Sequence, residues 1–92
     1  MEYTLKINDI LKHKSGEYRI TGFKEYGEKP VTVVLIKTED GCTKREKFLN
    51  NTKEPIYFSK SEVKACIYHM TGKNYNNIKL VYNNGIVEQI EL

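Results

Sequence analysis

The chain has 92 residues and a formal net charge of +3, from 15 Lys and Arg against 12 Asp and Glu. Hydrophobic residues make up 39% and charged residues 29%, which is typical of a single globular domain over residues 1–92 and not of a disordered chain. No apolar run reaches the roughly 18 residues that cross a membrane, and no N-terminal segment has the pattern of a signal peptide. Two Cys exclude a disulfide-rich scaffold and favour a reducing compartment. Without a targeting signal or an apolar span, we expect a cytoplasmic location and no membrane contact.

The basic residues are 13 Lys and only two Arg. Lys acts as a point charge, whereas the planar Arg side chain reads guanine edges and binds phosphate through two hydrogen bonds. The positive charge is concentrated in residues 42–80, which carry eight basic and three acidic residues, while residues 1–41 are neutral. This pattern disfavours sequence-specific base recognition and leaves sequence-independent attraction to phosphate, with a solvated surface as the open alternative.

Short alternating segments in the N-terminal part are typical of β-strands. Glu2–Ile7 and Asp9–Lys14 are the first two, and Glu17–Tyr26 is the third. The alternation in the third segment changes phase after Gly22, which predicts a β-bulge at this glycine.

The next predicted strand, Val31–Thr38, is apolar on both faces and is the best candidate for a central strand. Asp40-Gly41 follows as a strong hairpin turn. The return segment, Cys42–Leu49, has a charged middle, which is typical of an edge strand protected from unwanted pairing.

A helix is predicted over Lys60–Thr71. Ser59 is the expected N-cap, and Glu62 three residues later completes a capping box. Gly72 is the expected left-handed residue after the last turn. Apolar side chains recur with helical spacing on one face of this segment: Val63, Cys66, Ile67 and Met70.

The C-terminal segment 77–91 is predicted to form a β-hairpin. A two-residue turn at Asn84-Gly85 would split its apolar residues between both faces. A three-residue loop with Gly85 in the left-handed conformation pairs Ile78 with Ile90 instead, and we expect this register. It places five side chains on one face: Ile78, Leu80, Tyr82, Ile86 and Ile90.

These elements predict an α+β fold. It consists of a small antiparallel sheet or an SH3-like, partly open barrel of three to five strands, one helix at about 60–71, and the C-terminal hairpin 77–91. The segment from Asp9 to Gly22 resembles the first strands of an SH3-like barrel. This resemblance is generic and implies a shape without implying a function.

Catalytic and metal chemistry find little support in the sequence. Cys66 and His69 lie three residues apart on the predicted helix, but Cys66 belongs to the apolar face, where a buried thiol is inert. Together with Cys42 and His13 they show neither C-x-x-C nor i, i+4 histidine spacing. We therefore expect a non-enzymatic protein with no catalytic residue, no cofactor and no metal site.

Binding is the favoured function, because Tyr lies close to Lys at several places in residues 42–80 and the two together suit phosphates and bases. The candidate binding residues are Lys44, Arg45, Lys47, Lys60, Lys64, Tyr68, Lys73, Tyr75 and Lys79. They predict a module that contacts nucleic acid or a nucleoprotein without reading sequence. Two alternatives stay open. One is a phage or mobile-element inhibitor or adaptor of a host protein, similar to anti-CRISPR proteins, and the other is a homodimer through the edge strand 42–49.

Overall fold

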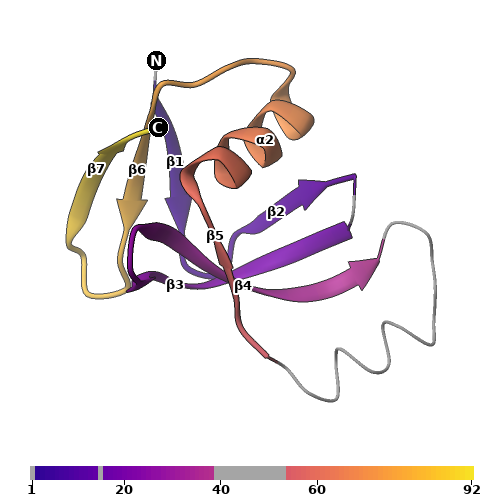
Figure 1. The fold of residues 1–92 in the computed structure, drawn as a ribbon. Coiled ribbons are helices and arrows are strands. Elements are labelled where there is room, and N and C mark those ends of the chain that lie inside the picture. The colour runs from indigo at the N-terminus through magenta and orange to yellow at the C-terminus, as the bar shows by residue number, and fades with distance from the viewer. Residues whose placement is uncertain (1, 15, 39–53) are drawn as a thin grey trace.

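The computed structural model describes residues 2–14, 16–38 and 54–92, and it confirms the α+β class (Figure 1). The described strands form two sheets, with the orders β1-β6-β7 and β2-β3-β4-β5. The strands are β1 (Glu2–Lys6), β2 (Ile10–His13), β3 (Gly16–Tyr26), β4 (Lys29–Thr38), β5 (Ile56–Phe58), β6 (Asn77–Val81) and β7 (Val87–Glu91). The helix described between β5 and β6 is α2 (Lys60–Thr71).

The helix begins and ends as predicted. The Ser59 Oγ accepts a hydrogen bond of 3.3 Å from the Glu62 N–H, and the Glu62 carboxylate accepts one of 3.0 Å from the Ser59 N–H. These two bonds satisfy N–H groups that the first turn leaves without helical partners. Gly72, with φ 73°, closes the other end by donating to the Tyr68 carbonyl at 2.7 Å.

The C-terminal hairpin also has the predicted register, with Ile78 opposite Ile90. Gly85 has φ 88°, and the Tyr82 N–H donates to the Ile86 carbonyl at 2.9 Å, which confirms the three-residue loop. One expectation is wrong: Ile86 is 59% exposed and does not join the buried face. It lies before the first residue of β7, beyond the edge of the core.

The four-stranded sheet confirms β4 as an interior strand and places the β3 bulge between Ile20 and Gly22. A Cβ atom at Gly22 would come within 2.5 Å of the Glu25 carboxyl group, so this glycine allows a close approach. The sequence analysis missed β5, which pairs antiparallel with β4 and sets Phe58 opposite Val31. A strand of three residues is too short to show an alternating pattern.

The first strand differs from the prediction. β1 pairs with β6 in parallel, with Tyr3 beside Ile78 and Leu5 beside Leu80, so the sheets are not all antiparallel. Neither sheet closes on itself within the described residues, and the SH3-like barrel is therefore not confirmed. The Asp40-Gly41 turn, the edge strand Cys42–Leu49 and the homodimer expected through it lie outside the described residues.

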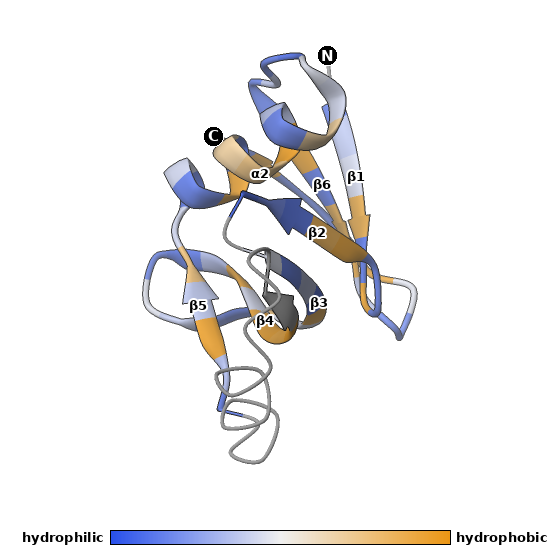
Figure 2. Cartoon of the chain, turned by 90° about the vertical axis from the view of Figure 1, so that its right-hand side faces the viewer, coloured by the Kyte–Doolittle hydropathy of each residue, from blue (hydrophilic) through white to orange (hydrophobic). Residues whose placement is uncertain are grey.

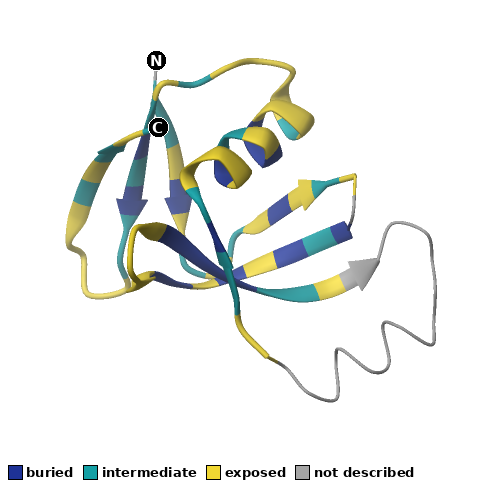
Figure 3. Ribbon diagram, in the orientation of Figure 1, coloured by how far each residue is buried: buried dark blue, intermediate teal, exposed yellow. Residues whose placement is uncertain are grey.

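The core lies where the helix and the two sheets meet (Figures 2 and 3). The helix packs against β2, β4 and β5, and its buried residues are Val63, Cys66 and Ile67. The chain passes from one sheet to the other at Asn8, which has φ 78° and donates from its N–H to the Ile20 carbonyl at 2.8 Å. The core is completed by Leu5, Leu11, Tyr18, Ile20, Phe23, Val31, Val33, Phe58, Ile78 and Leu80.

Among the described residues, no helix has both the length and the apolar composition that a membrane crossing requires.

Candidate functional site

The solvent side of α2 carries three of the predicted binding residues. Lys60, Lys64 and Tyr68 follow one another at i, i+4 spacing, which places them along one side of the helix. Lys60 is exposed, Lys64 is half-buried, and the Tyr68 side chain is 52% exposed. The core residues of α2 hold this row in place, because they fix the rotation of the helix about its axis.

A hollow beside this row joins the helix to the end of β2. We call it the histidine hollow; it is an open depression with a volume of about 680 Å³. The side chains that give it its chemical character are His13, Lys14, Lys64, Tyr68 and His69. Two ammonium groups, two imidazoles and one phenol therefore line one surface depression.

The two imidazole rings lie against each other across the gap between β2 and α2. The ring centres of His13 and His69 are 5.9 Å apart, with an angle of 48° between the ring planes. Beside them, the Lys12 N–H donates to the Met70 Sδ at 3.3 Å, which ties the two segments together. His13 is half-buried and His69 is exposed.

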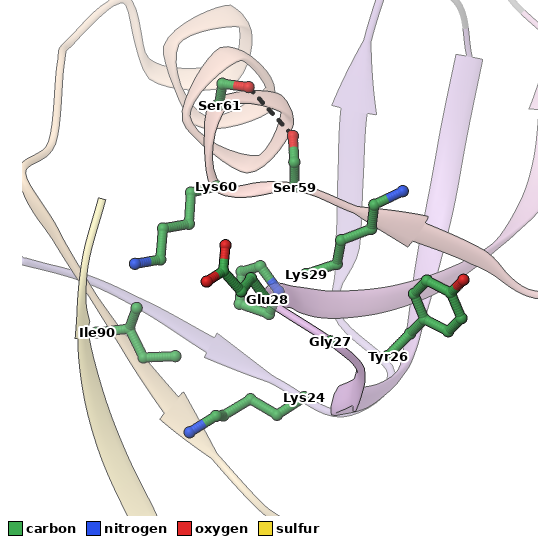
Figure 4. Close-up of a pocket in the computed structure, with 10 residues that line it drawn as sticks. Lys24, Tyr26, Gly27, Glu28, Lys29, Ser59, Lys60, Ser61 and Ile90 are labelled. Atoms are coloured by element: carbon green, nitrogen blue, oxygen red, sulfur yellow. Dashed lines mark hydrogen bonds between the residues drawn. The ribbon is translucent and has the colours of Figure 1, made fainter.

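A second hollow, of about 860 Å³, lies between the β3–β4 turn, the start of α2 and β7. We call it the lysine hollow, because Lys24, Lys29 and Lys60 line it. In Figure 4 the Lys60 side chain lies to the left of the Glu28 carboxylate and the Lys24 side chain lies below it, with Tyr26 at the right. The Lys29 Nζ is 5.9 Å from the centre of the Tyr26 ring.

Charge pairing lowers the positive charge that the lysine hollow offers to a ligand. The Lys24 Nζ is 2.6 Å from the Glu88 Oε2, and the Tyr82 hydroxyl donates to the Glu88 Oε1 at 2.9 Å. Hydrogen bonds from Lys24 and Tyr82 hold the pKa of the Glu88 carboxyl below its ordinary value. Burial, followed by the bond to Glu88, raises the pKa of Tyr82. Ser61 lines both hollows, so the two lie on either side of the first turn of the helix.

Three of the other predicted residues, which the structure does describe, line neither hollow: Lys73, Tyr75 and Lys79. The Tyr75 ring packs edge-on against Tyr3, with 5.3 Å between the ring centres, and contributes to the core. The Lys79 Nζ is 3.5 Å from a Glu2 carboxylate oxygen. Lys73 is exposed just after the helix end. Lys44, Arg45 and Lys47 lie outside the described residues.

The Cys66 thiol is buried, and burial, helped by the negative charge of Glu62, raises its pKa to about 11. The thiol is therefore uncharged at neutral pH, which does not suit a nucleophile. Because the thiol is uncharged, Cys66 and His69 do not form a catalytic pair, although they lie three residues apart in the sequence.

Sequence reasoning missed the contribution of His13 and Lys14 to the site. Both lie about 50 positions before the helical residues that they meet, and only the packing of β2 on α2 brings them there. No spacing between neighbouring residues in the sequence predicts that these side chains meet.

Comparison with protein-family models, with curated proteins and with solved structures finds no significant match to this chain.

Proposed function

We propose that the protein is a small, non-enzymatic, cytoplasmic binding module that contacts single-stranded nucleic acid without reading its sequence. The observation that supports this proposal most is the meeting of Lys14 and Lys64 with the exposed Tyr68 ring in the histidine hollow. Ammonium groups bind phosphates by charge, and an aromatic ring stacks on any base, since every base has a flat face.

The residue types also favour contact that is independent of sequence. Within the part of the chain that the structure describes, both hollows are lined by Lys and neither is lined by Arg. Arg19, the Arg within the described residues, lies on β3 and is not among the residues that line either hollow. Lys does not have the planar guanidinium group with which Arg makes two hydrogen bonds to one base edge, so sequence-specific recognition is disfavoured. Binding would then depend on phosphate charge and stacking, and would weaken steeply as salt increases.

The lysine hollow extends this surface past the start of α2. Lys29 and Lys60 face it without an ion pair to a described carboxylate, whereas the charge of Lys24 is balanced by Glu88. We therefore assign the main phosphate contacts to Lys14 and Lys64, with Lys60 as the next contact along the strand.

The test is fluorescence anisotropy of a labelled oligo(dT) or oligo(U) strand titrated with the full chain, starting from about 20 mM salt. The Lys14→Gln, Lys64→Gln double variant is expected to reduce the slope of log affinity against log salt by about 1.4, or roughly 0.7 for each lost phosphate contact on a single strand. Tyr68→Ala is expected to weaken binding by about 1–3 kcal/mol with an unchanged slope, because it removes stacking alone.

The matched control is Lys6→Gln with Lys12→Gln, since both lysines are exposed and line neither hollow. This variant carries the same loss of charge but leaves the histidine hollow intact. The proposal is refuted if the wild type does not bind at low salt. It is also refuted if the control variant loses as much slope as the double variant.

A specific observation also favours the second candidate function, a phage or mobile-element inhibitor or adaptor of a host protein. Ile86 is 59% exposed and Val87 is 52% exposed, and β7 is an edge strand of its sheet. An edge strand with apolar neighbours suits pairing with a strand of a partner protein. Retention of one host protein by the wild type after nuclease treatment, lost in Ile86→Ser with Val87→Ser, would favour this function over the first.

A further inference from the structure

The geometry points to a divalent transition-metal site that His13 and His69 form together across the histidine hollow, with water in the remaining coordination positions. Imidazole is a preferred ligand of Cu²⁺, Zn²⁺ and Ni²⁺. The two rings come from different elements, β2 and α2, and their centres are 5.9 Å apart.

The distance between the rings is close to what a shared metal ion requires. A metal–nitrogen bond of about 2.0–2.1 Å puts the ion about 3.2 Å from each ring centre, so two rings at a tetrahedral angle have centres about 5.2 Å apart. The observed 5.9 Å is longer than this, so the two rings would have to turn toward each other when the metal binds.

The backbone around the two histidines is already fixed. The Lys12 N–H donates to the Met70 Sδ at 3.3 Å, and these residues directly adjoin His13 and His69 in the chain. β2 is paired with β3, and the buried Ile67 holds the last turns of α2 to the core. The metal would therefore bind a site whose two halves are already in place, which reduces the entropy cost of binding.

Charge limits the affinity of this site. Among the described residues no three His, Cys, Asp or Glu side chains form a metal-binding group, so no carboxylate joins the pair. Lys14 and Lys64 line the same hollow and repel a cation. We therefore expect dissociation constants of about 1–100 μM, with Cu²⁺ bound more tightly than Ni²⁺ or Zn²⁺.

The experiment is isothermal titration of the full chain with Cu²⁺, Zn²⁺ and Ni²⁺, and with Mg²⁺ as the oxygen-preferring control. We expect one site for each of the first three ions and no binding of Mg²⁺. His69→Gln, a change at an exposed position, and His13→Gln are each expected to lower the affinity about 10-fold or more, because each removes one of two ligands. Excess Zn²⁺ should also raise the unfolding temperature of the wild type but not that of His69→Gln.

Two further variants distinguish metal binding by the histidines from nucleic-acid binding and from metal binding by Cys42. Lys14→Gln with Lys64→Gln should bind Zn²⁺ about two- to tenfold more tightly, because it removes repulsion from the hollow, although the same variant is expected to weaken nucleic-acid binding. Cys42→Ser should bind as the wild type does, which assigns the ion to the histidines. The metal site and the proposed function can thus fail separately.

The inference is overturned if neither Cu²⁺ nor Zn²⁺ saturates the protein below about 1 mM. It is equally overturned if His69→Gln binds these ions as well as the wild type, or if Cys42→Ser abolishes binding.

Discussion

Replacing Ile67 by Ala tests whether the buried face of α2 holds the candidate site in place. The Ile67 side chain is 0% exposed and lies between Lys64 and Tyr68 in the chain. Truncation removes three carbon atoms, a loss of about 2.4 kcal/mol at about 0.8 kcal/mol for each buried carbon. The cavity left behind raises the expected cost to about 3–4 kcal/mol. The whole domain is stable by only about 5–14 kcal/mol on the usual scale per residue.

The assay is urea unfolding followed by far-ultraviolet circular dichroism, with Ile86→Ala as the matched control. Ile86 is 59% exposed, so the same chemical change there should cost less than about 0.5 kcal/mol. Ile67→Ala should lower the melting temperature by about 12–32 °C, at about 4–8 °C for each kcal/mol. A loss below about 1 kcal/mol, or one equal to that of the control, would show that the helix does not pack as described.

Three further predictions concern the cap, one carboxylate and the thiol. Ser59→Ala should destabilise the protein by about 1 kcal/mol in thermal unfolding, and Ser59→Asp, which keeps an acceptor at the N-cap, should restore most of this loss. Glu88 has a lowered pKa when folded, so its contribution to stability is present above the ordinary Glu value of 4.5 and is lost as the pH falls through the lowered value. The melting temperature of Glu88→Gln should therefore fall less on acidification than that of the wild type, and parallel curves would contradict this. In a Cys42→Ser background, alkylation of Cys66 at about pH 8 should be slow when the protein is folded and fast in urea, since the folded thiol has a pKa of about 11; equal rates would show an accessible thiol.

The parts of the fold that the sequence predicted are those specified by residues close together in the chain. The capping box at Ser59 and the left-handed Gly72 lie within the helix they delimit, and Gly85 lies within its own hairpin. Each signal acts over a few residues, so no tertiary contact is needed to interpret it. β5 lacked such a signal, because its partner β4 lies more than 15 residues earlier in the chain.

The candidate site likewise has one part set by residues close together in the sequence and one part set by tertiary contacts. The row of Lys60, Lys64 and Tyr68 was predictable, because helical spacing alone puts these residues on one side. The arrival of His13 and Lys14 beside that row depends on the packing of β2 against the helix, which no spacing in the sequence records. A pair of histidines far apart in sequence therefore looks unremarkable until the fold brings the two rings together.

The parallel strand β1 explains why the expectation of antiparallel strands alone was wrong. It also explains why Tyr75 and Lys79 do not join the candidate site. A two-stranded hairpin is marginally stable by itself, and the fully buried Ile78 and Leu80 of β6 require a further neighbour. β1 supplies it with Leu5 beside Leu80, although the next strand along the chain belongs to the other sheet. Because β1 lies against β6, Glu2 reaches Lys79, and the Tyr3 ring meets the ring of Tyr75, just before β6. The same pairing, which the sequence did not reveal, therefore draws Tyr75 and Lys79 into structural contacts. Lys14, Lys64 and the exposed Tyr68 ring remain together in the hollow between α2 and the end of β2.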